Sequence, residues 1–69
     1  MDTITIAFVL QRVRQLGLTI RYQPEYQEFK VDYQKHDPRW TEDTAYYTTY
    51  RDDAIETAKV MASYSPHNQ

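Results

Sequence analysis

The stretch TEDTAYYTTYRDDAIETAKVM, residues 41–61, decides the fold because it passes from strand-forming to helix-forming residues within a few positions. Residues 44–50 are rich in threonine and tyrosine, which favour strands. The alanine-rich segment that follows has apolar residues three and four positions apart and predicts a helix. We expect Asp52 or Asp53 to cap this helix, with Asp53 and Glu56 at capping-box spacing. A strand then leads directly into a capped helix.

Residues 5–16 predict a first helix near the N-terminus. Thr3 or Thr5 can cap its start, and Gly17, the only glycine of the chain, is suited to end it in a left-handed conformation. The apolar residues of this segment recur at spacings of three and four and form one stripe: Ile6, Val9, Leu10, Val13 and Leu16. This stripe is the expected core face of the helix.

Two segments between the predicted helices alternate between apolar and polar residues, which is typical of half-buried strands. They are LTIRYQ at 18–23 and YQEFKVDY at 26–33, and Pro24 stands between them at the second position of a tight turn. We therefore expect an antiparallel hairpin, then a loop over residues 34–43 with Trp40 on the edge of the domain, and then the third strand.

The predicted order is helix, three-stranded antiparallel meander, helix, an α+β fold with both helices on one sheet face. We expect a single domain over residues 1–64 and a frayed polar tail over residues 65–69. The opposite sheet face is then open, and it carries Thr19, Arg21, Gln23, Glu28, Lys30 and Asp32. The third strand adds either Thr44, Tyr46, Thr48 and Tyr50, or Ala45, Tyr47 and Thr49.

Composition limits the classes of function. The chain has 69 residues, no cysteine and a formal charge of -2. A domain of this size has little room for a deep cleft, and without cysteine it has neither disulfides nor thiolate metal sites. The N-terminal segment fits neither a signal peptide nor a membrane span, so we expect a cytoplasmic protein with no membrane association.

Catalytic motifs are not recognisable. His36 and Asp37 with Arg39 and Asp43 lack the convergent spacing of a metal or general-base site. Acids that are adjacent in sequence, such as Asp52 and Asp53, are accounted for by helix capping, and no glycine-rich phosphate loop exists. We expect no enzyme, no cofactor and no bound metal.

Nucleic acid is the alternative partner. The helix-strand-strand-strand-helix order resembles the double-stranded-RNA-binding domain in topology. Where that family carries a lysine-rich stretch at the start of the last helix, this chain carries Asp52, Asp53 and Glu56, which repel phosphates. Instead, tyrosines on the open sheet face can stack on unpaired bases with Arg21 and Lys30 beside them. The alternative function is therefore a small nucleic-acid-binding module that uses this face.

Protein binding is the function that we expect, because tyrosine, tryptophan and arginine dominate binding hot spots. Acidic residues at 37–56 add electrostatic steering. An edge strand that pairs with a second copy of the chain makes a homodimer a further alternative. The candidate partner-binding residues are Arg21, Tyr26, Arg39, Trp40, Tyr46, Tyr50, Asp52 and Asp53.

The segments GLTIRYQPEYQEFKVDY and RWTEDTAYYTTYRDDAIETAKVMA, residues 17–33 and 39–62, carry a resemblance to known proteins. A strand pair followed by Y-T-x-x-R-D-D-A-x-x-T-A and a closing helix resembles short orphan proteins of bacteriophages and other mobile elements. In size and architecture the chain is similar to several anti-CRISPR proteins. The resemblance implies an inhibitor that occupies the surface of a host protein or ribonucleoprotein complex, either by imitating nucleic acid with its acids or, as we favour, by plugging a protein surface.

Overall fold

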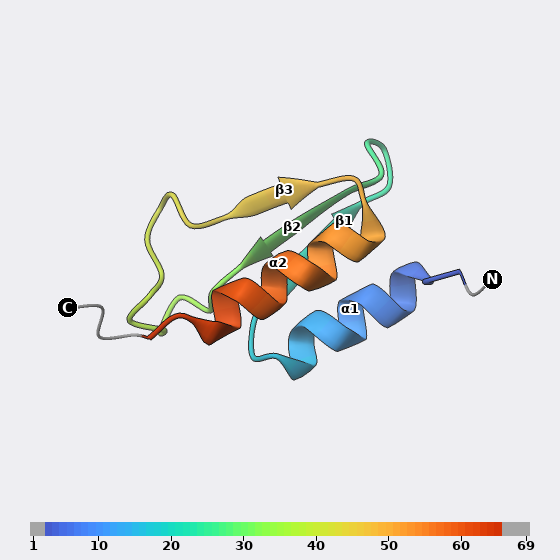
Figure 1. Ribbon diagram of the computed structural model, residues 1–69. Coiled ribbons are helices and arrows are strands. Elements are labelled where there is room, and N and C mark those ends of the chain that lie inside the picture. The colour runs from blue at the N-terminus through green and yellow to red at the C-terminus, as the bar shows by residue number, and fades with distance from the viewer. Residues whose placement is uncertain (1–2, 66–69) are drawn as a thin grey trace.

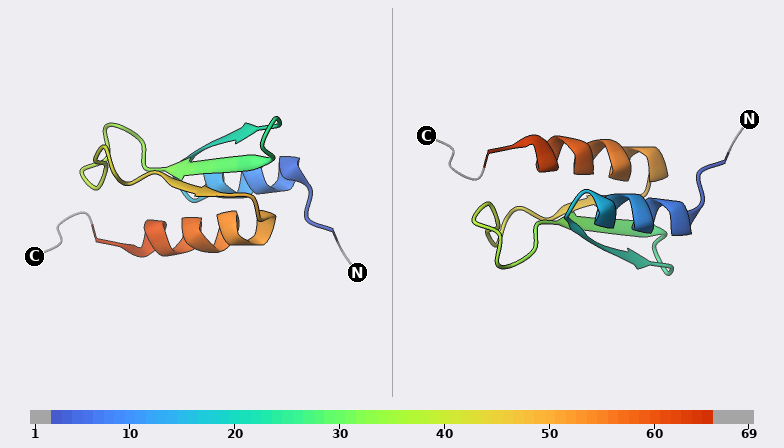
Figure 2. Two further views of the ribbon diagram at one scale, coloured as in Figure 1. Left: turned by 90° about the horizontal axis from the view of Figure 1, so that it is seen from above. Right: turned by 90° about the horizontal axis from the view of Figure 1, so that it is seen from below.

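The computed structural model describes residues 3–65 and confirms the α+β fold (Figure 1). Its elements are α1 (Ile6–Gln15), β1 (Thr19–Gln23), β2 (Glu28–Asp32), β3 (Tyr46–Thr48) and α2 (Arg51–Ser63). The sheet order is β1-β2-β3 and both neighbouring pairs are antiparallel. Figure 2 shows both helices on the same side of the sheet, which leaves the other face uncovered.

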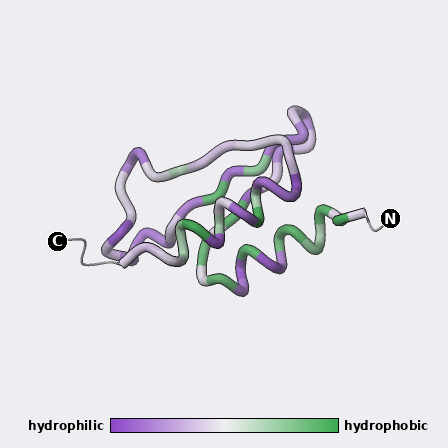
Figure 3. The backbone as a smooth tube through the Cα atoms, in the orientation of Figure 1, coloured by the Kyte–Doolittle hydropathy of each residue, from purple (hydrophilic) through white to green (hydrophobic). Residues whose placement is uncertain are grey.

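The core lies between this sheet and the two helices. Alternation along the strands turns Ile20, Phe29 and Val31 toward the helices, as the sequence predicted. Along α1 and α2, hydrophobic positions alternate with hydrophilic ones in Figure 3, as expected of helices with one buried face. The buried hydrophobic residues are Val9, Val13, Leu18, Ile20, Phe29, Val31, Tyr33, Ala54, Ile55, Ala58 and Met61.

The hairpin between β1 and β2 forms with the predicted turn. Its register pairs Gln23 with Glu28, and the backbone N–H of Tyr26 donates to the carbonyl of Gln23 at 3.2 Å. Pro24 occupies the second position of this turn, where its fixed φ is already suitable. Gln27 takes a left-handed φ of 51° and returns the chain to β2.

Both ends of α1 also follow the sequence prediction. The hydroxyl of Thr5 accepts a hydrogen bond from the backbone N–H of Phe8 at 3.0 Å, so Thr5 is the cap. The helix ends at Gln15, and Gly17 then adopts a φ of 86°. No atom lies close to where a Cβ of residue 17 would be, so the backbone conformation alone requires glycine.

The predicted cap of α2 is wrong. The helix begins at Arg51, and its N-cap is Tyr50, whose side chain makes no capping hydrogen bond. Asp52 and Asp53 lie inside the first turn instead, where their charges still favour the positive end of the helix dipole. Asp53 cannot act as the cap because β3 delivers an extended Tyr50 directly to the helix, and the carboxylate of Asp53 is bound to Tyr46.

The third strand is shorter than the predicted 44–50 and comprises Tyr46–Thr48. Thr44 leaves the strand because its hydroxyl donates to the Asp32 carboxylate at 2.7 Å. Pairing of Lys30 with Tyr47 places the Tyr47 set on the open face and turns Tyr46 and Thr48 toward the helices. The predicted tail falls almost entirely on residues 66–69, which lie outside the described residues.

Candidate functional site

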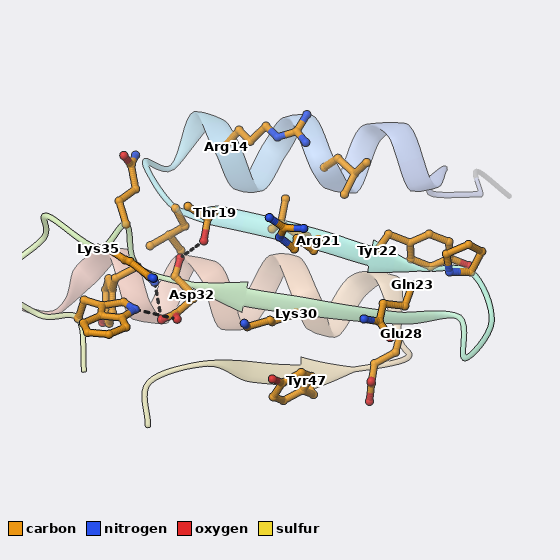
Figure 4. Close-up of a pocket in the computed structure, with 17 residues that line it drawn as sticks. Arg14, Thr19, Arg21, Tyr22, Gln23, Glu28, Lys30, Asp32, Lys35 and Tyr47 are labelled. Atoms are coloured by element: carbon orange, nitrogen blue, oxygen red, sulfur yellow. Dashed lines mark hydrogen bonds between the residues drawn. The ribbon is translucent and has the colours of Figure 1, made fainter. Parts of the chain in front are cut away.

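A row of three side chains crosses the open sheet face. The register places Arg21 on β1 opposite Lys30 on β2, and Lys30 opposite Tyr47 on β3. Residues that face each other across neighbouring strands share one side of the sheet, with Cβ atoms about 5 Å apart. Figure 4 shows these three residues on adjacent strands of the open face. Within residues 3–65 neither Arg21 nor Lys30 forms an ion pair.

Asp32, an acid on the same face, accepts several hydrogen bonds from other parts of the fold. Its carboxylate accepts from the indole N–H of Trp40 at 3.1 Å, from the hydroxyl of Thr44 at 2.7 Å and from the backbone N–H of Tyr33 at 2.7 Å. These bonds fasten the loop over residues 33–45 to the end of β2. They take up most of the acceptor sites of Asp32, but all three donors are neutral, so its negative charge remains.

The row lies in a shallow depression of about 1360 Å³ that extends from β3 across the sheet to α1. Arg14 of α1 and Lys35 of the loop bring two further cations to its rim (Figure 4). The ammonium of Lys35 lies 5.9 Å from the ring centroid of Trp40. Four cations and two carboxylates therefore line this depression: Arg14, Arg21, Lys30, Lys35, Glu28 and Asp32.

Exposed tyrosines gather at one end of the sheet, which we name the hairpin end and define as residues 24–27 and 49–52. Tyr26 at the β1–β2 turn is 69% exposed, and Tyr50 after β3 is 70% exposed. The antiparallel register places both at this end, because Gln23 pairs with Glu28 and Phe29 pairs with Thr48. Within the described part of the chain neither hydroxyl makes a hydrogen bond.

Arg39 lies at the opposite end, which we name the loop end and define as residues 33–45 with the last turn of α2. Its guanidinium donates to both carboxylate oxygens of Asp37, at 3.0 and 2.8 Å, and to the carbonyls of Met61, Ala62 and Tyr64. Carbonyls at a helix C-terminus lack partners within the helix, so Arg39 satisfies them. The candidate residue Arg39 thus holds the loop to α2.

These contacts shift the acidity of two groups at the loop end. Hydrogen bonds from the Arg39 side chain, followed by one from its backbone, lower the pKa of Asp37 to about 2. Burial raises the pKa of the Tyr33 phenol, while the nearby Arg39 opposes that rise. The phenol donates to the carbonyl of Met61 at 2.9 Å, and the guanidinium carbon lies 4.7 Å from the Tyr33 ring centroid.

Two other candidates, Tyr46 and Asp53, are bound to each other. The hydroxyl of Tyr46 donates to the Asp53 carboxylate at 2.6 Å and ties β3 to the first turn of α2. This bond raises the pKa of Tyr46, and it is the main reason why the pKa of Asp53 lies below its usual value. Asp52 is exposed at the same helix terminus, where its carboxylate accepts the backbone N–H of Asp53 at 2.9 Å.

The structure therefore divides the eight candidates into two groups. Arg21, Tyr26, Tyr50 and Asp52 are exposed, and within residues 3–65 their side chains make no hydrogen bond to another element; the last three share the hairpin end. The remaining four take part in contacts within the fold: Arg39, Trp40, Tyr46 and Asp53. Lys30 and Tyr47 were not among these eight candidates: the sequence placed Lys30 beside Arg21 only for the nucleic-acid alternative, and it left open whether Tyr46 or Tyr47 joined them on the open face. Only the strand register reveals this row.

Residues 3–65 contain no cluster of three or more side chains suited to holding a metal ion. Across the same residues, neither helix has the length and apolar character needed to cross a membrane. Comparisons of the chain with protein-family models, with curated proteins and with solved structures found no match.

Proposed function

We propose that this protein is a non-enzymatic protein-binding module that contacts its partner through the hairpin end. The observation that carries the proposal is the pair of highly exposed tyrosines at that end, Tyr26 and Tyr50. A tyrosine loses little conformational entropy on binding for its contact area, and its hydroxyl can form a directed hydrogen bond. Rings of this kind are the usual anchors of a protein interface.

The charges beside these tyrosines favour a partner with a basic rim. Asp52 is exposed at the start of α2 and Glu25 is exposed in the β1–β2 turn. These two acids outnumber Arg51, the exposed cation of the hairpin end, whose guanidinium donates to the carbonyl of Ile4 at 2.6 Å. Rim charges of one sign raise the rate of association with an oppositely charged surface and fix its orientation. The tyrosines then provide the buried contacts, and the acids provide steering.

The narrower form of the proposal is an inhibitor of phage or mobile-element type that blocks a host defence complex by occupying its surface. The resemblance of residues 17–33 and 39–62 to small orphan phage proteins supports it. The chain's size supports it too, because a domain of 69 residues can cover a binding surface without having an active site of its own.

The test is affinity capture of the tagged protein from bacterial extract, with and without nuclease, followed by mass spectrometry of the retained proteins. We expect a stoichiometric protein complex that survives nuclease. The double variant Tyr26→Ser, Tyr50→Ser should lose this complex, because both anchors are removed. Tyr64→Ser is the matched control: Tyr64 is 58% exposed but follows α2 at the loop end.

Equal retention by the double variant and the wild type would place the contact elsewhere on the molecule and contradict the proposed surface. Retention of nucleic acid alone would contradict protein binding itself. The narrower inhibitor form is measured by plasmid interference in a CRISPR-competent host. Wild-type protein should relieve interference and the double variant should not, while both proteins accumulate to the same level.

A further inference from the structure

The pairing of Arg21 with Lys30 is electrostatically unfavourable. Like charges directly opposite each other on one face of an antiparallel pair destabilise the sheet. An acid opposite a base would stabilise the pair instead, yet β2 places its acids, Glu28 and Asp32, two pairs away on either side. Within the described residues no ion pair neutralises either cation. An anion between these two side chains would remove the repulsion.

Charge is also segregated over the molecule. The chain carries a net charge of -2, but four cations and two carboxylates line the open-face depression. The surplus acids lie elsewhere, chiefly in the loop and at the start of α2. The open face is therefore locally positive on an acidic protein, and it favours an anionic ligand.

We propose that the open sheet face binds single-stranded nucleic acid, with a phosphate between Arg21 and Lys30 and a base against Tyr47. A guanidinium matches the oxygens of a phosphate, and an ammonium adds a second charge. Tyr47 continues the same row on β3 and is 55% exposed, so its ring offers a surface on which an unpaired base stacks. Arg14 and Lys35 line the same depression and add two further cations for neighbouring phosphates.

The aromatic ring in line with the cations favours nucleic acid over an acidic peptide as the occupant. Acidic side chains would use the two cations but have no use for the exposed ring, whereas a nucleotide supplies both an anion and a flat base. A single strand fits better than a duplex, because bases inside a duplex are stacked on one another and cannot reach Tyr47. This surface is separate from the Tyr26 and Tyr50 contacts, so the inference does not rest on the proposed function.

The experiment measures fluorescence anisotropy of a labelled oligothymidylate of about 20 nucleotides over a salt series that begins near 50 mM. Wild-type protein should bind, and its affinity should fall as salt rises. The variant Arg21→Gln, Lys30→Gln should bind at least about tenfold more weakly at low salt. Loss of this one phosphate contact should also reduce the slope of log K against log salt by about 0.7.

Two further variants separate stacking and general charge from the phosphate contacts. Tyr47→Ser should weaken binding by about fivefold or more without changing the salt slope, because stacking releases no counterions. Lys59→Gln, an exposed cation on α2, is the matched control and should bind as the wild type does. Circular dichroism of each variant confirms that the fold is retained.

Three outcomes would overturn the proposal: no binding of the oligonucleotide at the lowest salt, equal binding by wild type and the Arg21→Gln, Lys30→Gln variant, or tighter binding of polyglutamate than of the oligonucleotide. The last result would assign the face to an acidic protein surface. Tighter binding of a duplex than of the single strand would contradict the role of Tyr47. The Tyr26→Ser, Tyr50→Ser variant should still bind the oligonucleotide, which separates failure of this inference from failure of the proposed function.

Discussion

The loop end and the hairpin end of the sheet use the same residue types in opposite ways. At the loop end, Tyr33, Arg39 and Trp40 are all bonded to other parts of the fold. At the hairpin end, Tyr26 and Tyr50 extend into solvent with no side-chain hydrogen bond in the described part of the chain. The aromatic residues of this small chain therefore fall into two groups: some hold the fold together, and others are exposed and available for binding.

The loop end needs these bonds because residues 33–45 form no helix or strand, and their own backbone hydrogen bonds are those of isolated turns, such as Asp37 N–H to the Gln34 carbonyl at 2.8 Å. The loop is held at three points: by Asp32 at the end of β2, by Arg39 at the end of α2, and by the side-chain amide of Gln34, which donates to the carbonyl of Gly17 at 3.2 Å. The hairpin end needs no such fastening, since its turn is closed by backbone hydrogen bonds. Side chains that the fold does not require can be selected for contact with a partner instead.

Tyr33→Ala and Tyr26→Ala give the largest expected contrast between the two ends. Tyr33 is 5% exposed, and removing a buried aromatic ring costs about 3 to 5 kcal/mol. A domain of this size has about that much net stability, so Tyr33→Ala should be largely unfolded at room temperature. Tyr26→Ala should change the free energy of unfolding by no more than about 0.5 kcal/mol. Urea denaturation followed by circular dichroism measures both.

Tyr33→Phe refines this contrast because it keeps the ring and removes only the hydroxyl. The carbonyl of Met61 loses its 2.9 Å bond but still accepts from Arg39 at 3.3 Å, so the cost in free energy of unfolding should be about 1 kcal/mol.

The comparison of the two ends would be contradicted by a Tyr26→Ala protein that is as unstable as Tyr33→Ala. That result would show that the hairpin end is also required for the fold.

Asp37→Asn sharpens the comparison through pH. The folded-state pKa of Asp37 is about 2, below the ordinary value of 3.8. The Asp37 carboxylate therefore contributes its full stabilisation above about pH 4, and this stabilisation is lost as the pH falls from about 4 to about 2. Asp37→Asn should be less stable than wild type at neutral pH, and its free energy of unfolding should fall less steeply between pH 4 and 2.

Urea denaturation at a series of pH values measures this difference in slope. Glu42→Gln is the matched control, because Glu42 is an exposed acid of the same loop with no side-chain hydrogen bond among residues 3–65. It should keep the wild-type slope. An Asp37→Asn slope equal to that of the wild type would mean that Arg39 does not hold the Asp37 carboxylate in solution.

Local patterns in the sequence were sufficient to predict the element order, the hairpin turn, the Thr5 cap and the left-handed Gly17. Each depends on residues within a few positions of one another. The α2 cap was predicted wrongly for the same reason: Asp52 and Asp53 satisfy the local pattern, but the bond that engages Asp53 comes from Tyr46 on β3. A contact between two elements therefore determines the role of Asp53, and local helix propensity gives no information about such contacts.

The candidate surface was less predictable than the fold. Arginine is a residue type that is common in binding sites, but three acceptors that hold Arg39 in the fold, the carbonyls of Met61, Ala62 and Tyr64, lie 22 to 25 residues further along the chain. The row of Arg21, Lys30 and Tyr47 depends on strand register, since a shift of one residue would turn Tyr46 outward instead. Alternation alone left both choices for the third strand open.

Tyr46→Phe has the smallest expected effect and tests the contact that joins the sheet to α2 near the hairpin end. Its hydroxyl is the main reason why the pKa of Asp53 lies below the usual value, so that pKa should rise in the variant. NMR titration of the Asp53 side chain measures it. Because Tyr46 is 37% exposed while Tyr33 is buried, the loss of stability should be smaller than for Tyr33→Phe. Thr57→Val is the control, because Thr57 is a lesser contributor to the same shift and should move the pKa of Asp53 less.

An unchanged pKa of Asp53 in Tyr46→Phe would show that the Tyr46–Asp53 hydrogen bond does not persist in solution. Tyr46 would then join Tyr26 and Tyr50 among the tyrosines that the fold leaves available to a partner.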